Sequence, residues 1–487
     1  MQSLGGLDWT ICIGYLAAVL ALGVWFARRQ HSNEDYFVGG RKMHWLPIGL
    51  SVFAGTFSSN SFVGLPREAA YEDYHLLLGI LFIPLVVMPI IGWLFIPLFH
   101  RLGVTSAYEY LELRFSRPVR LTASALFIAY AIGWMGNMLL AVGKILKVVL
   151  DLNSLQLIWA LVAVGVFATL YTALGGVKAV VWTDAMQAFA LGAGMLALLF
   201  LAVGKIDGGW SAVVETGAAH RKFDMFRVEW DFTEKNFFAA CAFGFFVYLG
   251  GHAVNFTTVQ RYVSMPSVRD ARRSLVVTSV MVTAVCVLFF LVGSTLFVFY
   301  QQNPNPAFQA GVESSKAGDL LLPHFVLTEV PEIGLIGLLL AGLFAAAMSS
   351  MDSGINSVTA SVVCDWFAGR ELGLTVSRSL TVLFGAAIIA VATALLQIEA
   401  PIFEILIKIA GGFLGLLLGM FCLGMFCSRA NTGGTLIGVV CGIAGLGLLR
   451  MSSIHGWWWG AVTTMTTVIV GFAASYLFAK PTNNSAI

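Results

Sequence analysis

The chain has 487 residues, of which 58% are hydrophobic and only 11% are charged, and its formal net charge is +2. A soluble protein of this length needs more charge to cover its surface, so the composition excludes a soluble globular protein. The small net charge gives no indication of a nucleic-acid partner. The cysteines lie inside apolar runs without a CxxC pair, which predicts neither a disulfide framework nor a cysteine-bound metal.

Apolar runs predict an all-α integral membrane protein with about 13 transmembrane helices, each near the ~20 residues that a bilayer requires. The expected spans are 8–27, 45–65, 76–100, 121–150, 154–175, 178–204, 236–262, 275–301, 331–364, 376–397, 402–428, 433–450 and 457–479.

Basic residues predict the orientation. The connections on the same side as the C-terminus hold most of the lysines and arginines. Since positively charged loops stay in the cytoplasm, we expect the N-terminus outside and the C-terminus inside a plasma membrane, such as a bacterial inner membrane. The outer connections 205–235 and 302–330 are long enough to cover a vestibule, although ordered connectors would look the same.

Small and polar residues interrupt two of the expected spans, at Ala54–Ser61 in the second and at Gly250–Thr258 in the seventh. Glycine, serine and asparagine permit a helix to unwind, which exposes backbone carbonyls and half-helix ends. Each interrupted span begins a block of five, and matching breaks in two halves are typical of inverted-repeat transporters. The alternative is that these residues only allow neighbouring helices to approach closely.

These breaks predict a domain organisation with a 5+5 inverted-repeat core and extra helices at both ends. The expected parts are an extra N-terminal helix with its inner loop at 1–44, a first inverted repeat at 45–204, an outer loop at 205–235, a second inverted repeat at 236–428 and extra C-terminal helices at 429–487.

The ninth span carries a strip of small and hydroxyl-bearing residues along one helical face. The strip consists of Ala346, Ser349, Ser350, Ser353 and Ser357. Hydroxyl oxygens suit Na⁺, and carbonyls of the unwound second span would complete the ligand set. Alternatively, the serine hydroxyls bond back to their own helix.

Two acidic residues lie inside expected spans. Asp184 is near the start of the sixth span, with Gln187 one turn later, and Asp352 lies beside the serine strip. A carboxylate inside a membrane must pair, line water or bind an ion. Lys178 is close enough in sequence to pair with Asp184, and for Asp352 an ion ligand and a buried partner of a basic residue both remain open.

Four motifs resemble the sodium:solute symporter family, which includes sodium/glucose, iodide, monocarboxylate, multivitamin and sialic acid cotransporters. The motifs are Tyr36–Arg41, Thr105–Phe115, Gly175–Gln187, and Asn255 with Gln260–Tyr262, where Phe256 replaces the family's usual glutamine. The resemblance covers nearly the whole chain, about residues 34–445. It implies a core like that of the leucine transporter.

The resemblance also implies particular binding residues. The first sodium would be held by carbonyls of Ala54, Phe57, Ala346 and Ser349 and the hydroxyl of Ser350. A second sodium or a proton would lie at Asp184 with Ser350 and Ser353, and with Asp352 as a further candidate. The solute would lie near Thr56, Ser58, Ser61, Asn137 and Asn255, with His252 as an additional candidate inside the second break.

The sequence therefore predicts a sodium-coupled symporter that imports a small organic solute, either a monocarboxylate or other organic anion or a sugar-like compound. The third span has no acid and 121–150 has no arginine, unlike the galactose and sialic acid carriers of the family. The alternative is a proton-coupled carrier with Asp184 as the proton relay. No enzyme motif is found. The expected partners are the solute, sodium ions and the lipid bilayer, around a monomeric transport unit.

Overall fold

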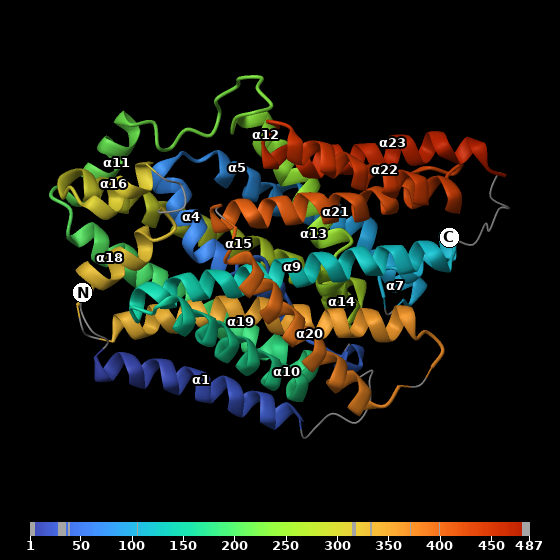
Figure 1. Ribbon diagram of the computed structural model, residues 1–487, viewed down its shortest axis with the longest axis horizontal. Coiled ribbons are helices and arrows are strands. Elements are labelled where there is room, and N and C mark those ends of the chain that lie inside the picture. Colours follow the sequence, from blue (N-terminus) through green and yellow to red (C-terminus); the bar gives the residue numbers. More distant parts are fainter. Residues whose placement is uncertain are drawn as a thin grey trace.

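The computed structural model describes residues 5–27, 36–37, 39–104, 106–313, 318–331, 334–370, 372–398 and 400–479. Within these ranges the regular structure is helical, without strands. Figure 1 shows most helices running along the same axis, with the start of α1 at one end of the molecule and the end of α23 at the other.

The helices in chain order are α1 (Gly6–Ala27), α3 (Trp45–Thr56), α4 (Ser59–Tyr71), α5 (His75–Phe82), α6 (Met88–Ile90), α7 (Ile96–Leu102), α8 (Glu109–Arg114), α9 (Arg117–Val149), α10 (Ser154–Gly204), α11 (Gly209–Ala219), α12 (Phe237–Ala242), α13 (Tyr248–Ala253), α14 (Phe256–Val263), α15 (Val268–Gln302), α16 (Pro306–Glu313), α18 (Leu321–Glu329), α19 (Leu335–Ser361), α20 (Leu374–Leu395), α21 (Ile402–Phe426), α22 (Thr432–Met451) and α23 (Trp459–Ala474). Turns of π-helix connect or extend some of them at η2 (Ile83–Val87), η3 (Ile91–Phe95), η4 (Phe243–Val247) and η5 (Val362–Trp366), and short 3-10 helices are η1 (Gly39–Arg41), η6 (Gly456–Trp458) and η7 (Ser475–Leu477).

In the described part of the chain, 10 helices are long and apolar enough to cross a membrane, or 12 when each of two bent pairs counts as one span. The expected number of spans is reached only if α1 is added, whose apolar part Gly6–Leu22 is shorter. The exact number therefore stays a prediction. The long connections 205–235 and 302–330 contain α11, α16 and α18, which gather at the end of the molecule where α1 begins in Figure 1.

The second expected span is broken, as the sequence predicts. Helices α3 and α4 meet at an angle of 60°. Phe57 and Ser58 between them have extended backbone angles, and the backbone N–H of Ser58 donates to the Ser61 hydroxyl at 3.5 Å. A polar residue that caps the new helix lets the chain restart after two non-helical residues.

The seventh expected span is also broken. The run from α12 through η4 to α13 meets α14 at 52°. Asn255 caps α14, and its side chain accepts a hydrogen bond from the backbone N–H of Thr257 at 3.0 Å. Both predicted breaks are therefore confirmed, and each one separates a helix C-terminus from a helix N-terminus inside the bundle.

A third interruption divides α10, where the sequence predicts two spans joined near residue 176. Gly176 has φ 56° and ψ −170°, a conformation that essentially only glycine adopts. The hydroxyl of Tyr36 donates to the carbonyls of Thr172 and Ala173 at 3.4 Å, next to this kink. The two spans consequently follow each other with little connecting loop.

Helix α19 lies at the centre of the bundle, with almost all of its residues buried. It packs against α10, α9 and α1. In contrast, α20 and the lipid-facing parts of α10 expose large apolar side chains such as Phe189, which is 79% exposed. A helix that is buried on all sides can carry polar side chains through the membrane because neighbouring helices shield them from lipid.

Replacing Gly176 by Ala should destabilise the protein by about 1–3 kcal/mol, because a Cβ is strained at this backbone conformation. The control is Gly192→Ala in the same α10, where an added Cβ meets nothing within 4 Å. Alanine should stabilise that helix by about 0.5–1 kcal/mol. Thermal unfolding of both purified variants measures the difference, and equal unfolding temperatures would contradict the role of the kink.

Candidate functional site

Oxygen atoms of the broken span and of α19 meet at the first break. The Ser349 hydroxyl donates to the carbonyl of Ala54 at 3.2 Å and to that of Ala346 at 3.1 Å. The Ser350 hydroxyl lies 3.5 Å from the same Ala346 carbonyl. In a continuous helix Ala54 would accept from the N–H of Ser58, but that group donates to Ser61 instead.

This arrangement fits a sodium ion. The break frees the Ala54 carbonyl from its helical partner, and the extended backbone of Phe57 places its carbonyl outside both helices. Carbonyl and hydroxyl oxygens are the neutral ligands that a small monovalent cation accepts. Four of the five residues expected from the sequence, Ala54, Ala346, Ser349 and Ser350, are therefore brought together, and Phe57 directly follows α3.

Asp184 lies in a buried cluster with Arg261 of α14. Its Oδ2 atom is 3.0 Å from the Arg261 guanidinium and accepts a hydrogen bond from the Ser51 hydroxyl at 2.5 Å. Arg261 also donates to Ser51 at 2.6 Å and contacts the Ser353 hydroxyl. The cation paired with Asp184 is thus Arg261, far away in sequence, and not the nearby Lys178 that the sequence suggests as a partner.

Asp352 occupies the adjoining part of the interface between α10 and α19. The Tyr171 hydroxyl donates to its Oδ2 atom at 2.5 Å, and the backbone N–H of Ser353 donates to Oδ1 at 2.6 Å. Both carboxylates are fully buried. Among the described residues, the hydrogen bonds of Asp352 come from hydroxyl and amide groups, so its interactions differ from those of Asp184.

The charges of this buried region balance only if one of its two acids is protonated. Asp184 and Asp352 bring two acidic groups, and the described side chain that pairs with them is Arg261. With both acids ionised, the region carries one excess negative charge in a low-dielectric environment. A proton on one acid or one further cation near Ser353, which contacts both carboxylates, would compensate this excess.

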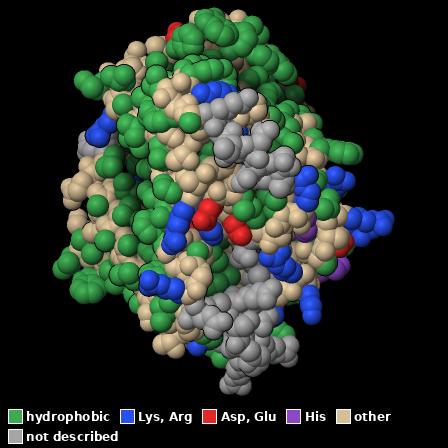
Figure 2. All heavy atoms as spheres, turned by 90° about the vertical axis from the view of Figure 1, so that its right-hand side faces the viewer, with side chains coloured by type: hydrophobic (Ala, Val, Ile, Leu, Met, Phe, Trp, Pro, Cys, Tyr) green, Lys and Arg blue, Asp and Glu red, His purple; other side chains and the backbone are tan. Residues whose placement is uncertain are grey.

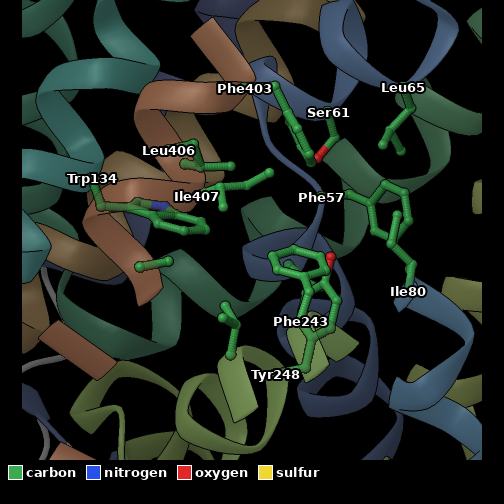
Figure 3. Close-up of a pocket in the computed structure, with 13 residues that line it drawn as sticks. Phe57, Ser61, Leu65, Ile80, Trp134, Phe243, Tyr248, Phe403, Leu406 and Ile407 are labelled. Atoms are coloured by element: carbon green, nitrogen blue, oxygen red, sulfur yellow. The ribbon is translucent and has the colours of Figure 1, made fainter. Parts of the chain in front are cut away.

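A pocket with an empty volume of about 450 Å³, which includes the space at its mouth, lies beside the first break. Figure 3 shows Ser61 next to Phe403, with Trp134 on the opposite side. Its lining consists of Thr56, Phe57, Ser61, Leu65, Ile80, Trp134, Phe243, Val247, Tyr248, Phe403, Leu406, Ile407 and Ala410. Thr56 and Ser61 belong to the predicted solute site, whereas no sequence signal distinguishes the aromatic residues from lipid-facing ones.

A second pocket, of about 460 Å³ of empty volume, is lined in part by the α19 residues Ser350 and Ser353. It is lined by residues of α3, α9, α14 and α19, among them Asn255, Arg261, Ser350 and Ser353. Trp134 lines both pockets. The indole ring of Trp134 on α9 therefore lies between the pocket beside the first break and the pocket beside the second break.

The other predicted solute residues, Ser58, Asn137 and His252, line neither of these pockets. Asn137 donates to the carbonyl of Ile402 at 2.9 Å, an interaction between α9 and α21. Ser58 and His252 are buried, and the Ser58 hydroxyl and the His252 Nδ1 atom have no hydrogen-bond partner among the described residues.

Two helices that are broken inside a bundle of membrane-spanning helices are typical of the secondary transporters built from inverted repeats. Residues 36–442 match the sodium:solute symporter family, so the chain belongs to that family. It is a sodium-coupled solute symporter and not an enzyme, and Na⁺ is its coupling ion.

Two bacterial relatives resemble the chain over its whole length. The sodium/sialic acid symporter NanT of Aliivibrio fischeri is 32% identical, with 100% of this chain and 96% of the relative covered. The sodium/sialic acid symporter SiaT of Proteus mirabilis is 31% identical, with 98% and 97% covered.

Solved structures agree with the fold. A Na⁺-coupled sialic acid symporter in a substrate-bound outward-open state has a TM-score of 0.88 at 31% identity, covering 98% of this chain and 99% of the other. MhsT in complex with L-phenylalanine has a TM-score of 0.58 at 14% identity, covering 90% and 98%, which shows the shared fold alone. The predicted leucine-transporter-like fold is confirmed by these neighbours.

The buried ion pair gives a testable prediction. Replacing Asp184 by Asn should destabilise the protein by about 3–5 kcal/mol, because it leaves Arg261 buried without its counter-charge. Adding Arg261→Met should recover a large part of that loss, since it removes the unpaired charge. Unfolding of the purified variants, together with the double-mutant cycle, measures the coupling between the two residues.

The control is Glu404→Gln, which removes one partner of the half-exposed pair between Glu404 and Lys408. It should change stability by only about 0–1 kcal/mol. If Asp184→Asn lowers the free energy of unfolding as little as this control does, Asp184 does not compensate the charge of Arg261.

Proposed function

We propose that the coupling sodium binds among Ala54, Phe57, Ala346, Ser349 and Ser350, and that its binding controls the import of a small organic solute. The observation that carries the proposal is the contact between the Ser349 hydroxyl and the Ala54 carbonyl, which is freed by the break. All five groups offer uncharged oxygens, so their affinity for a cation depends on how closely α3 and α19 approach.

The proposed mechanism is alternating access. Helices α3 and α19 belong to the two expected repeats, 45–204 and 236–428, so the cage lies between the halves of the core. Cation binding stabilises the arrangement in which the two helices touch, and its release permits the halves to move relative to each other. The solute-binding state is thus linked to occupation of the cage.

The sodium gradient supplies enough free energy for accumulation. One sodium ion entering across ~100 mV contributes about 2.3 kcal/mol. A tenfold concentration ratio adds about 1.4 kcal/mol. The sum supports a few hundredfold accumulation of a neutral solute.

We further propose a second cation near Asp184, Ser350, Ser353 and Asp352, as the charge excess of this region favours. A second sodium would roughly square the accumulation ratio. Because Arg261 already pairs with Asp184, the second cation would compensate the charge of Asp352. The alternative to this second sodium is a proton at the same site. A different alternative is a carrier driven by protons alone, in which Asp184 relays the proton and uptake needs no sodium.

For the solute, we propose contacts with Thr56, Ser58, Ser61, Asn137, His252 and Asn255 around the two breaks. The position of Thr56 and Ser61 in the pocket supports this assignment. The solute is a monocarboxylate, another organic anion or a sugar-like compound. The two bacterial relatives are sialic acid symporters, but 121–150 of this chain has no arginine that could hold a sugar acid.

We propose that the protein lies in the plasma membrane, as a bacterial inner-membrane protein with a monomeric transport unit. The N-terminus lies outside and the C-terminus in the cytoplasm. In support, Figure 2 views the end opposite the N-terminus, where lysine and arginine side chains are spread around the face and few acidic groups are seen. Such an excess of basic groups is typical of the cytoplasmic side.

Ser350→Ala should abolish sodium-stimulated uptake, because one ligand of the cage is removed. Uptake into proteoliposomes is measured with a sodium gradient and with potassium in its place. The control is Ser379→Ala on α20, where the hydroxyl only bonds back to Thr375 and is exposed. Unchanged sodium dependence in Ser350→Ala would remove the site assignment.

Asp352→Asn tests the second cation. With two sodium ions the Hill coefficient for sodium in the unmodified protein should approach 2, and it should fall to about 1 in the variant while sodium-dependent uptake continues. A coefficient near 1 in both proteins, together with proton movement that accompanies uptake and disappears in the variant, would favour the proton instead.

A further inference from the structure

Part of the long connection between α11 and α12 exposes large apolar side chains. Phe226, Val228 and Trp230 are 67%, 65% and 66% exposed, and Phe232 is 45% exposed. These residues alternate along the segment 226–232, which is neither helix nor strand. Apolar side chains that gather on a protein surface mark a contact with a partner or with a membrane.

The segment lies at the ends of two membrane-spanning helices. The backbone N–H of His455 donates to the carbonyl of Phe232 at 2.9 Å, directly before the span formed by η6 and α23. The ring of Trp230 lies 4.4 Å from that of Phe238 in the first turn of α12, which begins the other span. Figure 1 shows this green connection projecting from the edge of the bundle beside α12 and the start of α23. The exposed side chains therefore lie at the level where the two spans leave the membrane.

The apolar surface of the segment continues into the lipid-facing surface of α23. The rings of Trp230 and Phe232 lie 6.2 and 4.9 Å from the ring of Trp458, at the start of that helix. Met465 and Ile469 follow Trp458 by 7 and 11 residues, a spacing that places all three on one helical face. Both side chains are exposed, as expected of groups that contact acyl chains in a membrane protein. The segment thus borders the same lipid as α23.

The charged groups of the connection do not favour a negatively charged partner. The basic groups of Lys222, Arg227 and Lys235 bind oxygen atoms of the protein itself. Glu229 and Asp231, in contrast, are exposed between the apolar residues. Anionic headgroups would meet these two acids, so the apolar side chains and not the charges favour the contact.

Hydrogen bonds and an ion pair hold the segment in place at both flanks. The backbone N–H of Arg227 donates to Nε2 of His75, at the start of α5, at 3.2 Å. The N–H of Phe237 donates to the carbonyl of Arg227 at 3.2 Å. Nζ of Lys235 lies 2.5 Å from Oε1 of Glu68 in α4. Because the segment is already ordered, placing its side chains in lipid costs little conformational entropy.

We propose that the segment 226–232 is a membrane-surface anchor. Phe226, Val228, Trp230 and Phe232 insert at the boundary between the headgroups and acyl chains of zwitterionic phospholipids, in the leaflet at the end of the molecule where α1 begins. Aromatic side chains prefer this boundary, because their rings are apolar while the indole N–H of tryptophan binds a headgroup or water. The anchor holds the connection that contacts α4 and α5 at the membrane surface, and it does not depend on the proposed sodium and solute sites.

The test is labelling of the purified full-length protein by lipid, in nanodiscs of phosphatidylcholine. A fraction of the lipid carries a carbene-forming group at the start of its acyl chain, and mass spectrometry locates the adducts after irradiation and proteolysis. The reference is the stretch 301–304, which is exposed and polar and precedes α16 at the same end of the molecule. The segment 226–232 should carry at least about tenfold more adduct than this reference.

Variants of the segment test which side chains make the contact. Phe226→Ser combined with Trp230→Ser should lower the adduct yield on the order of tenfold, because two large apolar side chains are lost. The matched control is Glu229→Gln in the same segment, which should leave the yield within about twofold, since an exposed charge contributes little. Thermal unfolding in detergent verifies that each variant is folded.

The lipid composition provides a further control. Replacing phosphatidylcholine by phosphatidylglycerol should not raise the adduct yield, because the contact does not use a negative headgroup. A clear rise would overturn the proposal in favour of an electrostatic contact.

Labelling of 226–232 in the unmodified protein that is no stronger than labelling of 301–304 would also overturn the proposal, whatever the variants do. The size of the loaded nanodisc particles tests another occupant of this surface. If they contain two copies of the protein, and Trp230→Ser converts them to particles with one copy, a second copy covers the segment and the assignment to lipid is wrong.

Discussion

The structure depends on a contact between a helix that stops and a helix that continues. Where α3 ends, the Ala54 carbonyl loses its helical partner and lies 3.2 Å from the Ser349 hydroxyl of the intact α19. A free carbonyl in a membrane interior must find a donor or a cation. The structure shows this carbonyl paired with the serine hydroxyl, and the proposed sodium would bind the same carbonyl.

The buried charges impose a second constraint on the same interface. Arg261 enters the membrane interior on the short helix α14 and pairs with Asp184 of α10. The second broken span thus places its cation beside the strip of hydroxyls on α19, while Asp352 lies next to it with hydroxyl and amide donors. Under the proposed function, the charges of these side chains set how many cations the region could hold.

The pocket beside the first break and the proposed sodium cage share Phe57, because both are built on that break. Thr56 and Phe57 end one half-helix, and Ser61 lies in the first turn of the next. The break provides polar backbone on one side, while α9 and α21 provide Trp134 and Phe403 on the other.

The sequence by itself determined the membrane fold, both broken spans and the oxygen-rich face of α19, because apolar length, helix-breaking residues and helical spacing are local properties. The tertiary structure alone decided that Asp184 pairs with Arg261, that Asn137 bonds to Ile402, and which aromatic residues surround the solute pocket. Aromatic side chains that face lipid, the core or a pocket are surrounded by the same local sequence pattern. Only the packing of distant helices decides between these environments, because no short stretch of sequence records which neighbour a side chain will meet.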